Sequence, residues 1–461
     1  MGPSNIGTAS ARSNPCFRKL DLFFRSSHSI FNCNSNCSYT QLLPLAFKQS
    51  RGELSARWES PSKSIAAPFA DSNNHFRRPF AITVVYLMHS RYGQWMHDWE
   101  TRLTSVDNNR VIRPLEWGLE WTADWPGRNG APHGETPREL ATYFARFNDR
   151  IIQNSDEFYS YRKPADFRLE RREVQVFSTR EVPDLKLEEK VRGTHAEFLR
   201  FTSPVATPFP ENNLVNARWF PARGRRAVVV LPHWNADGLA YNSLCRVLNW
   251  LGIAVLRLSL LYHDIRRPQG AYRADYAVSA NIGRTIDSVR QGVVDARSCL
   301  DWLQSQGYNR LGIVGTSLGS CYSFIAASHD PRIRVAAFNH ASTYFADVVW
   351  HGQSTRHIRE ALQVALDVED LRQVFRAVSP MVYFDKFSRW PRKSLIIYAK
   401  YDLTFLPEFS RQVVAEFARH HLDHKVVVLP CGHYSMGEFP YNYMDGWHLA
   451  SFLRTAFETA D

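Results

Sequence analysis

The second half of the chain alternates short apolar runs with longer stretches in which apolar residues recur three or four positions apart. Several of the runs are almost continuously apolar, which is typical of parallel strands that are covered on both faces. The longer stretches have the spacing of amphipathic helices. We therefore predict strands at 227–232, 253–260, 311–315, 335–340, 394–400 and 426–430, and helices at 240–251, 279–306, 320–328, 408–420 and 443–459.

Three further strands are expected ahead of this alternation. The segments 174–177, 196–202 and 214–220 are rich in β-forming residues and are joined by turns that contain proline and asparagine. Strands in succession, followed by alternating strands and helices, predict an α/β fold. The expected sheet is doubly wound and mostly parallel, with an antiparallel start, and occupies residues 171–461.

Residues 342–390 interrupt this alternation between two predicted strands. The runs 358–366 and 371–378 have a helical pattern and would lie over the carboxyl ends of the strands. Two interpretations stay open for this segment. It forms a lid or a wall of a substrate pocket, or it consists of ordinary crossover helices.

An aromatic, helix-like extension precedes the predicted sheet at residues 88–170. Trp117, Trp121 and Trp125 are spaced four residues apart, which predicts one face of a helix, and 140–152 has the pattern of a second amphipathic helix. The tryptophan face is expected to pack on the main domain. The alternative is a belt at a lipid interface, which would give the protein a peripheral membrane contact.

Residues 1–87 are basic and rich in serine. They contain ten of the 56 Lys and Arg but only four of the 45 Asp and Glu. We expect no stable structure in this leader, whose composition is similar to that of an organelle transit peptide. A mis-assigned start is the rival explanation, since Met88 opens a more structured sequence. The compartment we expect is the cytoplasm. No apolar run approaches the ~18 residues of a membrane span.

Charge and cysteine content exclude several classes of protein. The net charge of +11 contains no dense basic run, so we do not expect a nucleic-acid partner. Four cysteines fall in predicted core elements, whereas the three in the leader lack a suitably spaced fourth ligand, so neither a metal site nor a disulfide framework is predicted. The core cysteines are Cys245, Cys299, Cys321 and Cys431, and the leader cysteines are Cys16, Cys33 and Cys37.

A serine stands at the centre of a glycine-flanked turn between a predicted strand and a predicted helix. The sequence at 315–319 is Gly-Thr-Ser-Leu-Gly, directly after the apolar run 311–314. Glycines two positions before and after the serine permit a strained turn in which larger side chains would collide with the strand and helix. Such a turn exposes the Ser317 hydroxyl and offers the Leu318 N–H to a developing oxyanion. A glycine-rich turn without chemistry is the alternative.

An aspartate and a histidine follow Ser317 at the ends of later predicted strands. Asp402 comes directly after 394–400, and His433 comes after 426–430. A serine hydroxyl needs a base to remove its proton, and the base needs an anion that orients it. We therefore predict a triad of Ser317, Asp402 and His433, against the alternatives of a turn-capping aspartate and a structural histidine.

With these motifs, residues 171–461 resemble an α/β-hydrolase of the serine esterase or lipase type, similar to the abhydrolase-domain proteins. The resemblance implies Ser317 as nucleophile, His433 as general base and acid, and Asp402 as the orienting carboxylate. It implies no metal and no cofactor. It does not explain residues 1–170.

Two loops supply further candidate residues. Many members of the family have His-Gly after the first parallel strand, whereas this chain has His233-Trp234, so the second oxyanion donor is expected to be the N–H of Trp234 or Asn235. We also assign His233 to substrate binding. In the next loop, Arg266 is a candidate for binding an anionic substrate group, and a solvated loop is the alternative.

The predicted activity is cleavage of a carboxylic ester, from a small molecule or a lipid, through an acyl-enzyme. Thioesterases, amidases, peptidases and acyltransferases use the same triad, so they stay open. A binding protein that keeps the fold without catalysis is the rival from another class.

Overall fold

The computed structural model describes residues 91–107, 110–126, 128, 136–177 and 185–459. The expectations for residues 1–87, including those for Cys16, Cys33 and Cys37, lie outside the described residues. None of the described helices combines the length and apolar character needed to cross a membrane.

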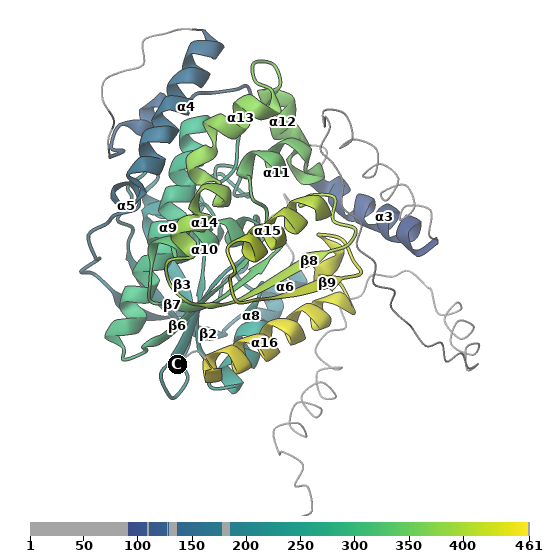
Figure 1. Cartoon of the computed structure of the whole chain (residues 1–461). Helices are drawn as coiled ribbons and strands as arrows, with labels where there is room; N and C mark the ends of the chain where they lie inside the picture. The colour runs from purple at the N-terminus through teal and green to yellow at the C-terminus, as the bar shows by residue number, and fades with distance from the viewer. Residues whose placement is uncertain (1–90, 108–109, 127, 129–135, 178–184, 460–461) are drawn as a thin grey trace, which may run out of the picture. The chain divides into compact units, whose positions relative to one another are not determined.

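The described residues contain one sheet of nine strands in the order β1-β2-β3-β5-β4-β6-β7-β8-β9 (Figure 1). Neighbouring strands are antiparallel from β1 through β3 to β5, and parallel from β5 to β9. This confirms the predicted parallel sheet with an antiparallel start. The strands are β1 (Arg168–Glu173), β2 (His195–Thr202), β3 (Leu214–Phe220), β4 (Arg226–Leu231), β5 (Ala254–Leu258), β6 (Arg310–Thr316), β7 (Ile333–Asn339), β8 (Lys393–Ala399) and β9 (His424–Leu429).

Helices cover both faces of the sheet, which explains why its central strands are mostly apolar. In β4, Val229 and Leu231 belong to the core shared with α9 and α10, whereas Val228 and Val230 belong to the core shared with α8 and α16. Alternate residues of one strand therefore serve opposite layers. The covering helices are α8 (Asn242–Trp250), α9 (Ile282–Ser305), α10 (Leu318–His329) and α16 (Tyr441–Thr459), as Figure 1 shows. All four predicted core cysteines are buried and free.

The segment 342–390 folds as a set of short helices between β7 and β8. These are α11 (Phe345–His351), α12 (Arg356–Leu362), α13 (Val368–Val374) and α14 (Phe384–Phe387), and α15 (Pro407–Arg419) follows β8. We call 342–390 the insertion. A capping box of Asp367 and Asp370 begins α13.

The N-terminal extension contains α3 (Arg91–Thr104), α4 (Pro137–Gln153) and α5 (Ser155–Phe158). Thr136 caps α4 in a box with Glu139, which confirms the helix predicted at 140–152. Asn148 of α4 donates to the Val374 carbonyl and accepts from the Ala377 N–H, both at 2.7 Å. The extension is therefore bound to the insertion by buried hydrogen bonds.

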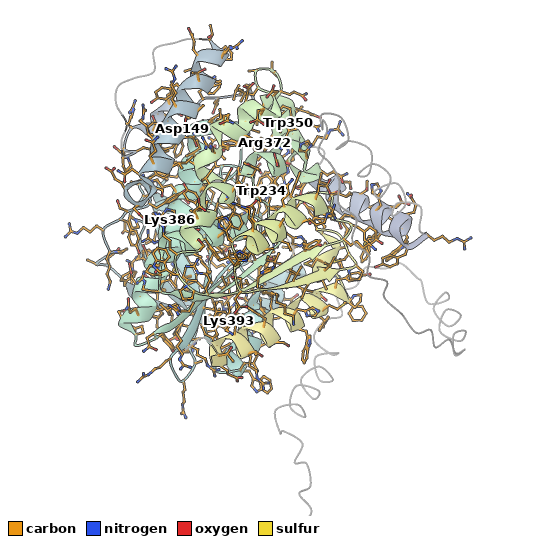
Figure 2. The ribbon with its side chains drawn as sticks, viewed as in Figure 1. Asp149, Trp234, Trp350, Arg372, Lys386 and Lys393 are labelled. Atoms are coloured by element: carbon orange, nitrogen blue, oxygen red, sulfur yellow. The ribbon has the colours of Figure 1, made fainter. Side chains whose placement is uncertain are left out.

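Ion pairs add to this contact at the surface. Arg376 of the insertion pairs with Asp149 of α4 at 2.6 Å, and Lys386 of α14 pairs with Asp156 of α5. Figure 2 labels one partner of each pair, Asp149 and Lys386. The Arg376–Asp149 pair is exposed on both sides and contributes little to stability, whereas the Lys386 side chain is buried. The buried groups between the two segments therefore carry most of the contact energy.

The predicted tryptophan face is wrong as a helix and right as a packing surface. Only Leu119–Thr122 forms a 3₁₀ helix, because Gly118 adopts φ 64° and breaks a continuous helix. Trp117 stacks on Phe144 and Trp121 stacks on Phe209, and Trp125 is 3% exposed. Trp117 and Trp121 are half-buried and Trp125 is buried, so the three side chains pack on the main domain as expected.

The first predicted strand is displaced. The structure places β1 at Arg168–Glu173, and residues 174–177 lie outside it. The β1 sequence is RLERRE, which has no apolar alternation because the strand forms the edge of the sheet and pairs only with β2. Charged side chains are favoured on such edges, so hydrophobic patterning could not locate this strand.

Phe147 tests whether the extension is part of the core. Its ring is fully buried and stacks on Trp125 at 5.4 Å. We expect Phe147→Ala to lower the free energy of unfolding by about 3–5 kcal/mol. Arg146→Ala, at an exposed position of the same helix, is the control and should change it little. Equal denaturation midpoints for the two variants would contradict an integral extension.

Candidate active site

Ser317 lies at the turn between β6 and α10 with φ 56° and ψ −119°. A Cβ added at Gly315 would lie 2.1 Å from the Gly319 carbonyl oxygen, and one added at Gly319 would lie 2.3 Å from the Leu231 carbonyl oxygen. Only glycine fits at either position. The turn therefore has the strained geometry that the glycine spacing predicts, with the serine hydroxyl directed away from the sheet.

A chain of hydrogen bonds joins the three predicted triad residues. Ser317 Oγ lies 3.1 Å from His433 Nε2, and His433 Nδ1 lies 3.0 Å from Asp402 Oδ2. An ionised carboxylate only accepts, so the proton of neutral His433 is on Nδ1. Nε2 is then free to accept the proton of the Ser317 hydroxyl. The arrangement has the polarity needed to activate a serine.

Parallel strands bring these residues together although they are far apart in the sequence. Asp402 follows β8 and His433 follows β9, so both lie at the same edge of the sheet as Ser317. Asp402 Oδ1 accepts from the N–H groups of Thr404 at 2.8 Å and Phe405 at 2.7 Å. The Phe405 ring stacks on His433 at 5.4 Å. Backbone N–H groups thus hold the Asp402 carboxylate, and the Phe405 ring holds the His433 imidazole.

The local charges favour an ionised aspartate and a basic histidine. Burial disfavours both charged forms, but the adjoining His433 and His340 hold the pKa of Asp402 well below its usual range. Burial also opposes protonation of His433, yet Asp402, Glu100 and Asp107 raise the pKa of His433 above its ordinary value. His433 is therefore a stronger base than a histidine in water.

His340 is a site residue that was not predicted. It follows β7, and its Nδ1 lies 2.7 Å from Asp402 Oδ2, the oxygen that also binds His433. The two imidazole centroids are 4.3 Å apart. Its place at the end of a predicted parallel strand was visible in the sequence, at the same edge as Asp402. No motif distinguishes it from other residues at strand ends.

Glu100 is a second unpredicted residue, and it comes from the extension. Its buried carboxylate accepts from the backbone N–H groups of Tyr434 at 2.7 Å and Ser435 at 2.9 Å. Burial raises the pKa of Glu100. A Cβ at Gly432 would lie 2.3 Å from the Glu100 carboxylate, so the carboxylate packs directly against the loop. Helix α3 therefore holds the loop that carries His433.

Asp107, just beyond α3, adds a further contact to this loop. Its carboxylate accepts from the Tyr434 hydroxyl and pairs with Arg110 and Arg273. Burial raises the pKa of Asp107. The Arg110 guanidinium in turn lies over the Trp234 ring at 4.6 Å. The extension thus connects the His433 loop to the loop after β4.

Ser317 and His433 line a cavity of about 1240 Å³. The insertion contributes part of its wall. The lining residues from the insertion include Phe345, Val348, Val349, His357 and Ile358. On another side, Asp445 of α16 lines the cavity, and burial raises the pKa of its carboxyl to about 7.

The three predicted oxyanion donors differ in whether their N–H groups are already hydrogen-bonded. Leu318 begins α10 directly after Ser317, which places its N–H beside the hydroxyl. The Asn235 N–H donates to His263 Nε2 at 2.8 Å and is therefore engaged. Trp234 lines the cavity and its N–H is left as the candidate for the second donor. Its indole N–H donates to the Ala274 carbonyl, which fixes the side chain in the wall.

His233 lies in the cavity wall, whereas Arg266 does not. His233 Nδ1 is 2.9 Å from the Tyr241 hydroxyl, and burial lowers the pKa of His233 to about 3, so this imidazole is neutral. The assignment of Arg266 to substrate binding is wrong. Its guanidinium is fully buried and pairs with Asp295 at 2.8 Å, because a charge inside the fold needs a partner.

The described residues contain one cluster of potential metal ligands, formed by His340, Asp402 and His433. Their ligand atoms lie within 4.8 Å of one another. Hydrogen bonds from the two histidines to Asp402 account for this closeness without an ion.

The sheet order, the serine at a strained strand-to-helix turn, and the aspartate and histidine after later parallel strands together decide the fold. The chain has the α/β-hydrolase fold. Residues 91–170 add α3, α4 and α5 to it.

No protein-family model and no curated protein matches the sequence. Solved structures with similarity to this chain include a Pyrococcus horikoshii acylaminoacyl peptidase, with a TM-score of 0.45 and 10% identity over 59% of this chain and 43% of the peptidase. A Pyrococcus furiosus esterase, Pf2001, has a TM-score of 0.38 and 14% identity over 57% of this chain and 91% of the esterase. Acetyl xylan esterase 1 from Thermoanaerobacterium has a TM-score of 0.45 and 16% identity over 74% of this chain and 99% of the esterase. The strand order of this chain itself defines the fold.

The change Glu100→Gln tests the contact between α3 and the His433 loop. The amide nitrogen of glutamine cannot accept a hydrogen bond, so a buried backbone N–H loses its partner at a cost of about 1–3 kcal/mol. We expect faster amide hydrogen exchange in the peptide 430–437. Asp98→Asn, at an exposed position of α3, is the control. Unchanged exchange in the Glu100 variant would contradict this role.

Proposed function

We propose that this chain is a serine hydrolase that cleaves a carboxylic ester. The observation that supports the proposal is the hydrogen-bonded series of Ser317, His433 and Asp402 in the wall of a large cavity. A serine hydroxyl that only served the fold would not need a histidine and a buried carboxylate aligned behind it.

In the first half of the reaction, Ser317 Oγ attacks the ester carbonyl carbon while its proton moves to His433 Nε2. The oxyanion that forms takes hydrogen bonds from the Leu318 N–H and the Trp234 N–H. Asp402 stabilises the imidazolium and stays ionised. The C–O bond then breaks, and His433 gives its proton to the departing alkoxide, which leaves as an alcohol.

In the second half, water attacks the acyl group on Ser317. His433 Nε2 removes a proton from this water and returns it to Ser317 Oγ as the acyl C–O bond breaks. The carboxylic acid is released and the hydroxyl is restored.

The cavity supports a substrate larger than a short-chain ester. Its volume of about 1240 Å³ exceeds the ~300–1,000 Å³ that is usual for small-molecule sites. Its lining combines aliphatic and aromatic side chains with charged ones. Thioesters, amides and transfer of the acyl group to another acceptor use the same residues, so they remain alternatives to ester hydrolysis.

Labelling with a fluorophosphonate tests the proposal directly. We expect the wild type to react covalently and Ser317→Ala to lose the labelling. Ser342→Ala is the matched control, since Ser342 is also a buried cavity serine but donates only to the Tyr344 carbonyl. Hydrolysis of p-nitrophenyl esters of increasing chain length would then measure the size of the acyl site. A folded wild type that neither labels nor hydrolyses these esters supports a non-catalytic binding protein instead.

The pH dependence of kcat/KM should follow the ionisation of His433. Only the neutral imidazole accepts the serine proton, and the nearby carboxylates raise its pKa. Activity is therefore expected to fall as the pH drops through a midpoint above 6.5, the ordinary pKa of histidine. Asp445 also titrates in the cavity, so Asp445→Asn serves to assign the profile and should leave this midpoint in place. A midpoint below 6.5 would contradict the charge arrangement.

A further inference from the structure

Two histidines share one oxygen of the Asp402 carboxylate. His340 Nδ1 lies 2.7 Å from Asp402 Oδ2, and His433 Nδ1 lies 3.0 Å from the same atom. The proposed mechanism uses only His433. The bond to His340 is the shorter of the two, and His340 is almost fully buried.

The protons in this arrangement can be assigned from chemistry. An ionised carboxylate has no hydrogen to donate, so both imidazoles carry a proton on Nδ1. Asp402 Oδ1 already accepts from the N–H groups of Thr404 and Phe405. Each carboxylate oxygen therefore accepts two hydrogen bonds, and the group has no freedom to rotate.

The backbone holds His340 in an unfavourable conformation. Its φ is 52°, a region that residues other than glycine rarely occupy. Its N–H donates to the Ile397 carbonyl at 2.9 Å, and its carbonyl accepts from Ser320 Oγ, also at 2.9 Å. Ser320 Oγ also donates to the Ser317 carbonyl. His340 is thus hydrogen-bonded to strand β8 and to the serine turn. Strained backbone conformations of this kind cluster at active sites.

We propose that His340 is a positioning residue of the active site. Its Nδ1–H fixes the Asp402 carboxylate toward His433 and takes up part of the negative charge on Oδ2. In this way His340 sets how strongly Asp402 attracts the Nδ1 proton of His433. The inference rests on the proposed function of Ser317, His433 and Asp402.

Loss of the His340 donor has two expected effects. The carboxylate gains rotational freedom, so His433 is less well aligned with Ser317 and the reaction slows. Oδ2 also keeps more charge for His433, which raises the pKa of His433 and moves the acid limb of the pH profile upward. The titratable groups of the described residues that face His433 are Asp402, His340, His233, Glu100, Asp107 and Tyr434, and five of these are unchanged in a His340 variant.

Three substitutions distinguish the Nδ1 donor from the bulk of the side chain. His340→Asn keeps an amide N–H close to the position of Nδ1, and asparagine tolerates positive φ. His340→Gln places its amide farther out, and His340→Phe keeps a ring without a donor. His329→Phe removes another buried histidine, which is bonded to the Ile325 carbonyl and Ser155 Oγ and has no bond to Asp402, so it is the control for a purely structural loss.

The readout is the second-order rate constant for fluorophosphonate labelling of Ser317 as a function of pH, with the unfolding midpoint of each variant measured alongside. We expect His340→Phe and His340→Gln to lose about 10–100-fold, by analogy with the loss measured when the hydrogen-bond partners that orient metal-ligating histidines are removed. Their acid limb should move to higher pH. His340→Asn should stay close to the wild type in both rate and profile, and His329→Phe should lower stability without moving the profile.

The outcomes separate this inference from the proposed function. A reactive wild type together with folded Phe and Gln variants of unchanged rate and profile overturns the role of His340 alone. So does an Asn variant as impaired as the Gln variant, since the Nδ1 donor would then not be the cause. If the Phe variant fails to fold, the comparison between Asn and Gln decides. A wild type that does not react with the probe overturns the proposed function and, with it, this role.

Discussion

The buried carboxylate of Asp402 is the group on which the site depends. A charge with almost no solvent exposure costs several kcal/mol unless it is fully hydrogen-bonded. Two backbone N–H groups satisfy Oδ1 and two imidazoles satisfy Oδ2. The loops after β7, β8 and β9 must therefore converge on one point, and this convergence places His433 within hydrogen-bonding distance of Ser317.

The extension before the sheet also fixes the position of the His433 loop through buried carboxylates. Glu100 pairs with two backbone N–H groups of that loop, and Asp107 binds the Tyr434 hydroxyl. Helix α4 supports the insertion, which contributes part of the cavity wall, through the buried hydrogen bonds of Asn148. The residues that lie outside the α/β-hydrolase fold thus stabilise both the His433 loop and the cavity wall. Their negative charge also favours protonated His433, so the extension contributes to the electrostatics of the site.

Local pattern was sufficient for the elements that lie in the core. Eight of the strands could be located because apolar runs and turn residues mark a buried strand independently of its partners. The exposed β1 could not, since its charged sequence acquires strand geometry only by pairing with β2. The spacing of Trp117, Trp121 and Trp125 matched a helix, yet Gly118 turns the chain and the rings pack on separate partners. The spacing of apolar residues alone predicts neither where the chain turns nor which distant residues a side chain contacts.

The sequence by itself determined the parallel sheet, the strained serine turn and the identity of Ser317, Asp402 and His433 as candidates, because each follows from short-range features at strand ends. Only the tertiary structure decided how these residues are supported. Glu100 and His340 reach the site from distant segments, and Arg266, which the sequence placed near substrate, instead neutralises Asp295 inside the fold. The sequence does not distinguish a charged side chain that faces substrate from one that binds a loop or pairs with a buried charge. Its role is set by which groups the fold brings within hydrogen-bonding distance and by how much water is left around them.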